Sequence, residues 1–560
     1  MAVSSLWNAP HDFFSFYVAK LLPALSIASF VFIFKRKWWM IMASIIIDLW
    51  MVANFIYYRA NDLFLDTETI LIVDNLNGFW SSIATYLNWK SLSFFVLTIL
   101  LYMLLAFVNV RNERNWKHFG IATVISIILF LGDHFAGYST YKTTLPKNQN
   151  GWTYSAFKSA FQITSGNYFF DNFVFNQWFE AQSPLHFFPA LLYKQICSFF
   201  YGPKEISLSE EDKINIEEFV NKSALDTNIV KQNLVIILGE SFEDWAFKMK
   251  DNNNCEITPN MNALRKQENI LYVNKIRSQV RRGNSGDGQM IINSGLLPIE
   301  SGAACMLYGK NVYPNFAHKF ETSIIINSVS GIWNQKNTTY SYGYKNLKEL
   351  SNPNDKWNWV EDDETMQFSI QQCKTMNQPF CMMIITVSTH SPFSSPRKSH
   401  LSFCDGTPQI VQDYLNCMHY ADSCIGVFLN LLDKHSLLNN TTLVITGDHT
   451  IFRSNLLAEI QPVAQKYDLP IPQGESFCPL IISSPTIKKH TEIDTLCYQM
   501  DIYPTILHCL GINDYYWKGF GVNLLDSTSL QNRKISEEEA FRLSNLIIRS
   551  NYFATENICQ

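Results

Sequence analysis

The stretch that decides the fold is residues 233–242, which read NLVIILGESF. Five apolar residues, Leu234–Leu238, are followed by the small Gly239 and then by two polar residues, Glu240 and Ser241. An uninterrupted apolar run of this length, bounded by glycine, is typical of a strand that is buried on both faces. We therefore predict a central strand over Leu234–Leu238, with Glu240 just beyond its carboxyl end.

Similar apolar runs recur from about residue 228 onward, separated by helical stretches such as Val411–Leu432 and Met500–Leu510. The further predicted strands are Ser323–Asn327, Met382–Val387, Thr442–Thr446 and Leu480–Ser483. Continuous apolar strands between helices indicate an α/β domain whose mostly parallel sheet is covered by helices on both faces. In such sheets, ligands bind beyond the carboxyl ends of the strands.

Two of the predicted strands end in residues that can hold a metal ion. Glu240 follows Gly239, and the pair Asp448-His449 follows Gly447. Two carboxylates and an imidazole suit a divalent cation such as Mn²⁺, Mg²⁺ or Zn²⁺. A turn with a satisfied aspartate explains the Gly-Asp-His tripeptide as well when it is taken alone, so the interpretation depends on both strand ends lying together.

A glycine-rich loop, residues 281–288 (RRGNSGDG), precedes the apolar run Met290–Ile292. A loop of this kind at a helix start offers backbone N–H groups to an anion, and Ser285 within it could act as a nucleophile if a metal lowers its pKa. The alternative is an ordinary turn in which Ser285 caps a helix. His390 follows another predicted strand, where a lone histidine can also be purely structural.

The N-terminal part is organised differently, with four apolar segments about long enough to span a bilayer. These segments are Phe13–Phe34, Trp38–Tyr57, Ser91–Val110 and Phe119–Tyr138. Basic residues fall at 35–37 and 111–117, so the positive-inside rule places both loops in the cytoplasm and everything after Tyr138 outside. We predict a transmembrane region over residues 1–138, an interfacial connector over 139–227 and an extracytoplasmic catalytic domain over 228–560.

The net charge of −5 and the lack of a basic stripe give no reason to expect a nucleic-acid partner. The twelve cysteines all follow the apolar segments. Without a CxxC motif, we expect most of them to be small buried residues rather than ligands or disulfide partners.

Taken together, the motifs resemble the sulfatase-like branch of the alkaline phosphatase superfamily, and most closely its lipoteichoic acid synthases and phosphoglycerol transferases. The resemblance runs from about residue 233 to 525 and rests on elements in the family's order. These are residues 233–242, Thr258–Leu264, the loop with Ser285, Asn293–Pro298, Trp333-Asn334, Ser388–Phe393, Tyr420–Asp422, Thr446–His449 and Asp501–Thr505. Those synthases usually have five spans, whereas this chain shows four.

The resemblance implies that Glu240, Ser285, Asp448 and His449 hold a catalytic metal, with Mn²⁺ expected and Mg²⁺ or Zn²⁺ as alternatives. It also implies that Ser285 is the nucleophile, where the synthases use threonine. By the same resemblance, His390 would contact the transferred phosphate or assist the leaving group.

The resemblance also implies a substrate pocket lined by Trp333. Two residues later the synthases carry an arginine, and this sequence has Gln335, which cannot make a charged bidentate contact with phosphate. This departure weakens the assignment of glycerol phosphate as the transferred group.

The implied activity is transfer of a phospho-headgroup, glycerol phosphate first of all, from an outer-leaflet phospholipid to a glycan or polymer hydroxyl at a bacterial cytoplasmic membrane. Phosphoethanolamine transfer and a phosphodiesterase- or sulfatase-type hydrolysis are the alternatives. Residues 284–288 lack the Cys/Ser-x-Pro-x-Arg context that sulfatases need. A non-catalytic membrane scaffold would not need all four metal-site positions.

Overall fold

The computed structural model describes residues 37–61, six single helical positions between 96 and 125, and the stretches 208–222, 224, 230–299, 302–355, 358–394 and 401–555. Helix α3 (Lys37–Asn61) covers the second predicted membrane span, Trp38–Tyr57. The first predicted span and most of the other two lie outside the described residues. No helix in the described part of the chain combines the length and apolar character needed to cross a membrane. The four-span arrangement therefore stays a prediction.

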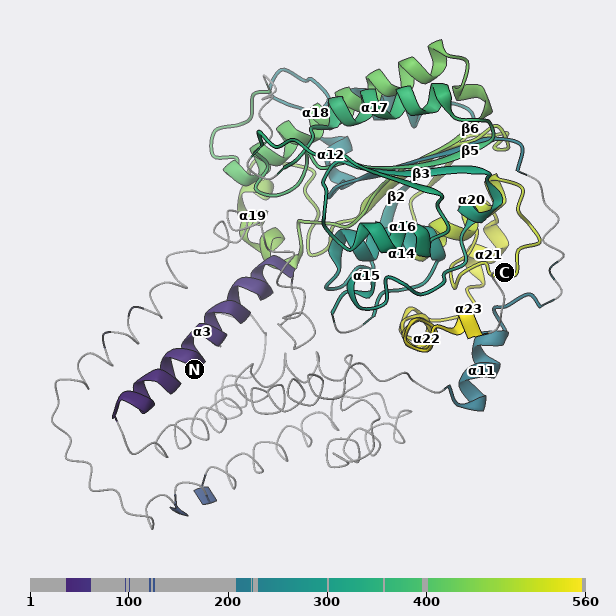
Figure 1. Ribbon diagram of the computed structural model, residues 1–560. Helices are drawn as coiled ribbons and strands as arrows, with labels where there is room; N and C mark the ends of the chain where they lie inside the picture. Colours follow the sequence, from purple (N-terminus) through teal and green to yellow (C-terminus); the bar gives the residue numbers. More distant parts are fainter. Residues whose placement is uncertain are drawn as a thin grey trace. The chain divides into compact units, whose positions relative to one another are not determined.

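The part of the chain from residue 208 onward belongs to a different compact unit from α3, and it contains a sheet of nine strands (Figure 1). The strand order is β4-β3-β5-β1-β6-β7-β2-β8, with β9 pairing separately with β2. The strands are β1 (Asn233–Gly239), β2 (Ile270–Arg277), β3 (Thr322–Asn327), β4 (Asn346–Glu349), β5 (Phe380–Ile385), β6 (Thr441–Gly447), β7 (Cys478–Ser483), β8 (Thr491–Ile493) and β9 (Cys497–Tyr498).

Central strand β1 shows why the sheet is sandwiched between helices, because all seven of its residues are buried. Alternate side chains point to opposite faces, so Leu234, Ile236 and Leu238 join one hydrophobic cluster while Val235 and Ile237 join another. The helices packed in the first cluster include α14 (Asn284–Ser294), α20 (Ile502–Cys509) and α22 (Glu537–Ser550). Those in the second are α12 (Trp245–Lys248), α13 (Pro259–Leu264), α17 (Asp362–Thr375), α18 (Gln409–Lys434) and α19 (Ser454–Lys466).

Figure 1 shows this layering, with α17 and α18 on one side of the sheet and α14 and α20 on the other. The remaining helices are short elements of the connections and the C-terminal end. They are α11 (Glu210–Glu217), α15 (Ala304–Leu307), η2 (Phe316–Lys319), α16 (Gln335–Ser341), η3 (Leu438–Asn440), η4 (Gln499–Asp501), α21 (Ser527–Gln531) and α23 (Tyr552–Thr555). Most of the described cysteines are buried in the two clusters, as expected for small apolar side chains.

The predicted α/β architecture is confirmed, including the five strands and the mostly parallel sheet covered on both faces. Two details differ from the prediction. Strand β7 runs antiparallel to both neighbours, β6 and β2. Strand β5 ends at Ile385 rather than at Val387, because the Asp362 carboxylate accepts hydrogen bonds from Val387 N–H (2.9 Å) and Ser388 N–H (3.2 Å) and draws the chain out of the sheet.

Two of the motifs singled out in the sequence form contacts of the scaffold. Asp422 on α18 accepts the backbone N–H groups of Asn260 (3.0 Å) and Met261 (2.8 Å), so it joins α18 to the first turn of α13. Asp501 makes a bidentate ion pair with Arg533, at 2.7 and 2.8 Å. Both carboxylates are fully buried and are used to connect elements that are far apart in the sequence.

Candidate active site

The candidate site lies where the two central parallel strands end. Strands β1 and β6 pair in register, with Gly239 opposite Gly447, so Glu240 and Asp448 are the next two residues across the pair. The Asp448 N–H donates to Gly239 O at 3.0 Å and extends the pairing by one step. The predicted convergence of these two strand ends is therefore what the structure shows.

Glu240 is held through its backbone and its side chain. Its N–H donates to Thr386 Oγ1 at 3.0 Å, and its carbonyl accepts from Thr389 Oγ1. The loop after β5 therefore binds both backbone polar groups of Glu240. Its Oε1 accepts from Ser241 Oγ at 2.9 Å. Ser241 itself adopts a positive φ of 53°, which marks a sharp turn directly after the strand. Glu240 cannot rotate away without breaking these contacts.

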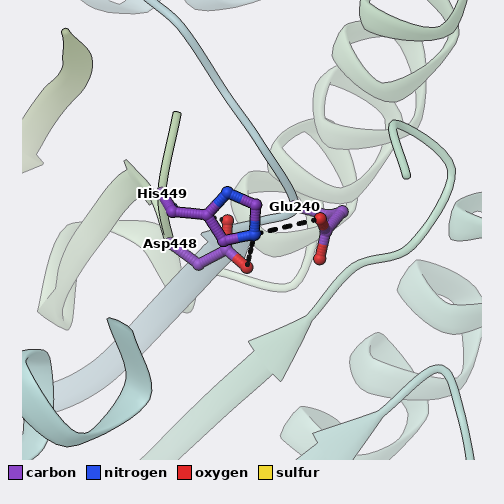
Figure 2. Close-up of side chains that lie close together, drawn as sticks. All are labelled: Glu240, Asp448 and His449. Atoms are coloured by element: carbon purple, nitrogen blue, oxygen red, sulfur yellow. Dashed lines mark hydrogen bonds and ion pairs between the residues drawn. The ribbon is translucent and has the colours of Figure 1, made fainter. Parts of the chain in front are cut away.

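Asp448 has one saturated oxygen and one that no donor reaches. Its Oδ1 accepts the N–H groups of Ser241 (2.8 Å) and His449 (2.7 Å), whereas its buried Oδ2 has no hydrogen-bond partner. Buried carboxylate oxygens are normally satisfied, so such an oxygen needs an explanation such as an ion. Oδ2 lies 3.7 Å from His449 Nε2, which is also 3.5 Å from Glu240 Oε1 (Figure 2).

The three side chains fit a divalent cation. Ligand atoms of Glu240, Asp448 and His449 all lie within 4.8 Å of one another. Burial, and after it the charge of Asp448, raises the pKa of Glu240 to about 8. A proton on His449 Nδ1 would donate to Thr450 O at 3.3 Å and leave the Nε2 lone pair facing both carboxylates, the orientation a metal ligand needs. Carboxylates with one imidazole match Mn²⁺, Mg²⁺ or Zn²⁺ without separating them.

Ser285 lies beside this cluster, in the first turn of α14. Its Oγ donates to Glu240 Oε2 at 3.1 Å and is 3.5 Å from His449 Nε2. The N-cap position belongs to Gly283, so the alternative of Ser285 as an ordinary cap is not what the structure shows. The hydroxyl instead points at the carboxylate that the sequence placed at the end of β1.

Glycines bring α14 close enough for this contact. A methyl group added at Gly288 would lie 2.4 Å from Asp448 O, so the helix backbone packs directly on the loop that carries Asp448 and His449. The start of the helix is fixed by Asp287, whose Oδ2 accepts the N–H groups of Arg281 and Gly283, both at 2.9 Å. Burial raises the pKa of Asp287 to about 7. The glycine-rich loop therefore serves close packing as well as any anion binding.

The remaining predicted residues surround the cluster less directly. His390 lies close enough to Asp448 for that charge to act on it, although desolvation dominates and lowers the pKa of His390. Its ring packs edge-on against Trp359, with centroids 5.0 Å apart. The Trp333 ring lies against Gly286, where an added methyl group would be 3.3 Å away, so it is next to the residue that follows Ser285 in the chain.

Gln335 is buried as the first residue of α16, and its Nε2 contacts Thr339 Oγ1 at 3.4 Å. Among the described contacts, none joins it to the four clustered residues.

Sequence reasoning missed the residues that support the candidate ligands. Gln499 Nε2 donates to Asp448 O at 2.7 Å, and Glu243 accepts the N–H groups of Ile451 (2.6 Å) and Phe452 (2.7 Å), just after His449. Glu243 stands three residues after Glu240 and directly follows the quoted stretch, so its position offered a signal. Gln499 offered none, because it is separated from Asp448 by 51 residues.

Comparison with known families matches two parts of the chain. The Sulfatase family covers residues 306–512, which include His390, Asp448 and His449. The family described as lipoteichoic acid synthase N-terminal domain covers residues 6–150. The two matched ranges do not overlap, and the predicted domain boundaries stay a prediction.

Among individual proteins, the chain is 22% identical over 535 residues to a lipoteichoic acid synthase from Staphylococcus saprophyticus, which covers 90% of this chain and 77% of that protein. It is 25% identical over 361 residues to lipoteichoic acid synthase 1 from Bacillus subtilis, covering 62% and 54% of the two chains. The crystal structure of the lipoteichoic acid synthase LtaP from Listeria monocytogenes superimposes with a TM-score of 0.50 at 18% identity, over 63% of this chain and 99% of that one. That likeness shows a shared fold.

Proposed function

Because the chain belongs to the sulfatase-like branch of the alkaline phosphatase superfamily and matches lipoteichoic acid synthases along most of its length, we propose that it is a membrane-bound phosphotransferase. The proposed reaction moves a phospho-headgroup, glycerol phosphate first of all, from an outer-leaflet phospholipid to a hydroxyl group of a glycan or polymer. The proposed location is a bacterial cytoplasmic membrane, with the catalytic domain on the outer side. A site held at the bilayer surface can reach a lipid donor that does not leave the membrane.

The observation that carries the proposal is the position of Ser285 Oγ. The hydroxyl lies 3.1 Å from Glu240 Oε2 and 3.5 Å from His449 Nε2, beside an unpartnered oxygen of Asp448. Ser285, Glu240, Asp448 and His449 would together hold a divalent cation, with Mn²⁺ proposed first. When bound, such a cation lowers the pKa of a nearby hydroxyl and neutralises charge on phosphoryl oxygens.

The proposed mechanism has two steps at Ser285. In the first, Ser285 Oγ forms a bond to phosphorus and the bond from phosphorus to the diacylglycerol oxygen breaks. The serine proton ends on the released diacylglycerol, and the phospho-headgroup remains on Ser285. In the second step the oxygen of an acceptor hydroxyl forms a bond to phosphorus, the bond from phosphorus to Ser285 Oγ breaks, and the acceptor's proton ends on Ser285 Oγ. Atoms and charges balance over the two steps.

His390 and the helix start supply the proposed help with proton transfer and orientation. The lowered pKa keeps the His390 imidazole neutral at neutral pH, so it can exchange a proton with the leaving or attacking oxygen. The start of α14 is proposed to help by holding the Ser285 hydroxyl against Glu240. Trp333, lying against Gly286, is proposed to line the pocket for the headgroup.

Gln335 bears on one part of the proposal, the identity of the headgroup. A neutral amide replaces the arginine that the related synthases carry, so binding of an anionic group at this position would be weaker. The exposed Lys336 next to it could supply a positive charge in part. Glycerol phosphate remains the proposed group, and phosphoethanolamine is the alternative.

The test is to incubate the purified full-length protein in lipid micelles with labelled phosphatidylglycerol or labelled phosphatidylethanolamine, with and without Mn²⁺. Diacylglycerol release that requires Mn²⁺ and prefers phosphatidylglycerol is the expected result. Label appearing on an added glycan would show transfer, whereas free glycerol phosphate would show hydrolysis. If neither lipid yields diacylglycerol, the proposed function is wrong.

A further inference from the structure

A second glutamate, Glu243, directly follows the stretch 233–242; it is as deeply buried as any residue of the site and is not used by the mechanism above. Its side chain has no exposed surface. Its Oε1 accepts the backbone N–H groups of Ile451 at 2.6 Å and Phe452 at 2.7 Å, and its Oε2 accepts the indole N–H of Trp245 at 2.5 Å. Three donors therefore converge on one carboxylate, and two of them belong to the loop that follows β6.

Phe452, which Glu243 holds, is fixed from the other directions as well. Its ring packs edge-on against Trp245, with centroids 5.1 Å apart, and against Tyr414 at 5.0 Å. Its carbonyl accepts a hydrogen bond from Ser476 Oγ at 2.8 Å. Backbone donor, backbone acceptor and side chain are all engaged, so the chain has a fixed anchor three residues after His449.

The same pair of loops is also tied together at its start. A methyl group added at Gly447 would lie 2.4 Å from Phe242 O, so the two backbones touch there. The Tyr414 hydroxyl donates to Ser241 O at 2.8 Å and accepts the Glu243 N–H at 3.1 Å, which fixes the loop after β1 from the α18 side. The metal-ligand candidates Asp448 and His449 thus lie between two anchors, at Gly447 and at Phe452.

We propose that Glu243 is a positioning residue, whose carboxylate sets the distance between the loop carrying Glu240 and the loop carrying Asp448 and His449. It touches no reacting atom, and it acts by holding Ile451 and Phe452. The inference rests on the proposed function only in taking these three side chains as metal ligands. It predicts that Glu243 controls metal affinity more than it controls folding.

A glutamine at this position tests the idea with almost no change in shape. If the amide oxygen faces Ile451 and Phe452, the amide NH₂ faces the indole N–H of Trp245, so two donors oppose each other. If the amide is flipped, its NH₂ faces two backbone N–H groups. Either orientation leaves buried donors unsatisfied, and the loop must shift to relieve this.

Asp422 provides the matched control. It is equally buried, and it accepts the backbone N–H groups of Asn260 and Met261 together with the Asn260 side-chain amide at 2.9 Å. Asp422→Asn therefore opposes donors in the same way, but between α13 and α18. A general loss of stability would appear in both variants, whereas a positional effect on the metal ligands would appear in Glu243→Gln alone.

The experiment measures Mn²⁺ binding to full-length protein by calorimetry, together with thermal unfolding, for wild type, Glu243→Gln and Asp422→Asn. We expect Glu243→Gln to raise the Mn²⁺ Kd about 10- to 100-fold, the range for loss of an outer-shell partner, at a temperature where it is fully folded. Asp422→Asn should leave the Mn²⁺ Kd within about twofold of the wild-type value, although it disturbs a matching set of buried hydrogen bonds. An unchanged Kd in Glu243→Gln, or an equal rise in both variants, would overturn the inference.

If Glu243→Gln does not fold, Ser476→Ala decides the matter. It removes the hydrogen bond to Phe452 O and the interaction of Ser476 with the Glu243 carboxylate, while the carboxylate itself stays, so a smaller rise in Kd supports the inference and an unchanged Kd contradicts it. Wild-type protein that binds no Mn²⁺ would also contradict it. Wild-type protein that binds Mn²⁺ but releases no diacylglycerol from either lipid would instead contradict the proposed function and leave the comparison of Kd values intact.

Discussion

The end of β1 and β6 and the junction of α13 with α18 both bury carboxylates, and the two regions use them differently. At the junction, both carboxylate oxygens of Asp422 accept hydrogen bonds from Asn260 and Met261. At the strand ends, Asp448 keeps one buried oxygen without a donor, and Glu240 and His449 face it. Residue type and burial are the same in the two places. The difference is whether hydrogen-bond donors have already satisfied the charge.

An unsatisfied oxygen is not enough to make a ligand, as two other aspartates show. Asp362 and Asp287 also have a buried carboxylate oxygen without a partner. Burial raises their pKa values to about 6 and about 7, and neither belongs to a group of converging ligand atoms in the described part of the chain. Among the described residues, Glu240, Asp448 and His449 are the group in which three ligand atoms converge. Convergence, rather than burial or an open oxygen alone, therefore distinguishes the candidate metal centre from carboxylates of the scaffold.

The largest effect expected from this comparison is the loss of turnover in Ser285→Ala. Removal of the hydroxyl that contacts Glu240 removes the proposed nucleophile, and headgroup transfer should fall at least about a thousandfold. The measurement is Mn²⁺-dependent diacylglycerol release from labelled phospholipid. Circular dichroism and membrane insertion should match wild type.

A buried serine of the scaffold is the control for that substitution. Ser369 on α17 is fully buried, and its Oγ donates to Thr365 O at 2.8 Å within the same helix. Ser369→Ala should keep wild-type turnover. Full activity in Ser285→Ala would remove Ser285 as the nucleophile and would leave the two regions indistinguishable by their hydroxyl groups.

The next largest effects are expected in Mn²⁺ affinity and in stability, compared between Asp448→Asn and Asp501→Asn. Loss of an outer-shell partner weakens metal binding about 10- to 100-fold. Asp448→Asn changes a candidate ligand itself, so it should weaken Mn²⁺ binding by at least this factor. The metal-free protein should be no less stable than wild type, because the charge that raises the pKa of Glu240 is gone. Asp501→Asn breaks a buried ion pair with Arg533 and should cost about 3 kcal/mol of unfolding free energy while leaving the Mn²⁺ Kd unchanged.

Calorimetry and chemical unfolding in the presence of a chelator check both variants. The informative result is a crossed pattern, in which one variant loses metal affinity without losing stability and the other does the reverse. If Asp448→Asn unfolded as readily as Asp501→Asn in the absence of metal, Asp448 would be a scaffold residue and the open oxygen would have no functional meaning.

Much of the sheet could be predicted because its central strands are apolar on both faces. Leu234–Leu238 and Thr442–Thr446 have only one reasonable interpretation, and the rule that ligands gather at carboxyl ends brought Glu240, Asp448 and His449 to one edge. The direction of β7 could not be predicted, because an uninterrupted apolar strand such as Leu480–Ser483 has the same pattern in either orientation. The structure brings the clustered side chains together, and their catalytic roles remain proposals.

The contacts that the supporting residues make could not be predicted from the sequence, for a different reason. The contact between Glu243 and Ile451 joins positions 208 residues apart, and the local sequence pattern of neither segment predicts it. Gly288 is a similar case, since a glycine within a glycine-rich loop predicts a turn or an anion site. Only the fold shows that Gly288 is needed because the Asp448 carbonyl lies against it.

That contact provides the smallest of the expected effects and the finest test of the comparison. Alanine at position 288 would favour the helix by about 1 kcal/mol, but its methyl group would lie 2.4 Å from a backbone oxygen that cannot rotate away. Helix α14 and the Asp448 loop must separate, and a displacement of this size at a reacting centre costs about 10- to 100-fold in rate. We therefore expect Gly288→Ala to lower the rate of diacylglycerol release while its unfolding temperature stays near that of wild type. Wild-type turnover in this variant would mean that the distance between Ser285 and the Asp448 loop is not critical, and the close packing of α14 would then belong to the scaffold.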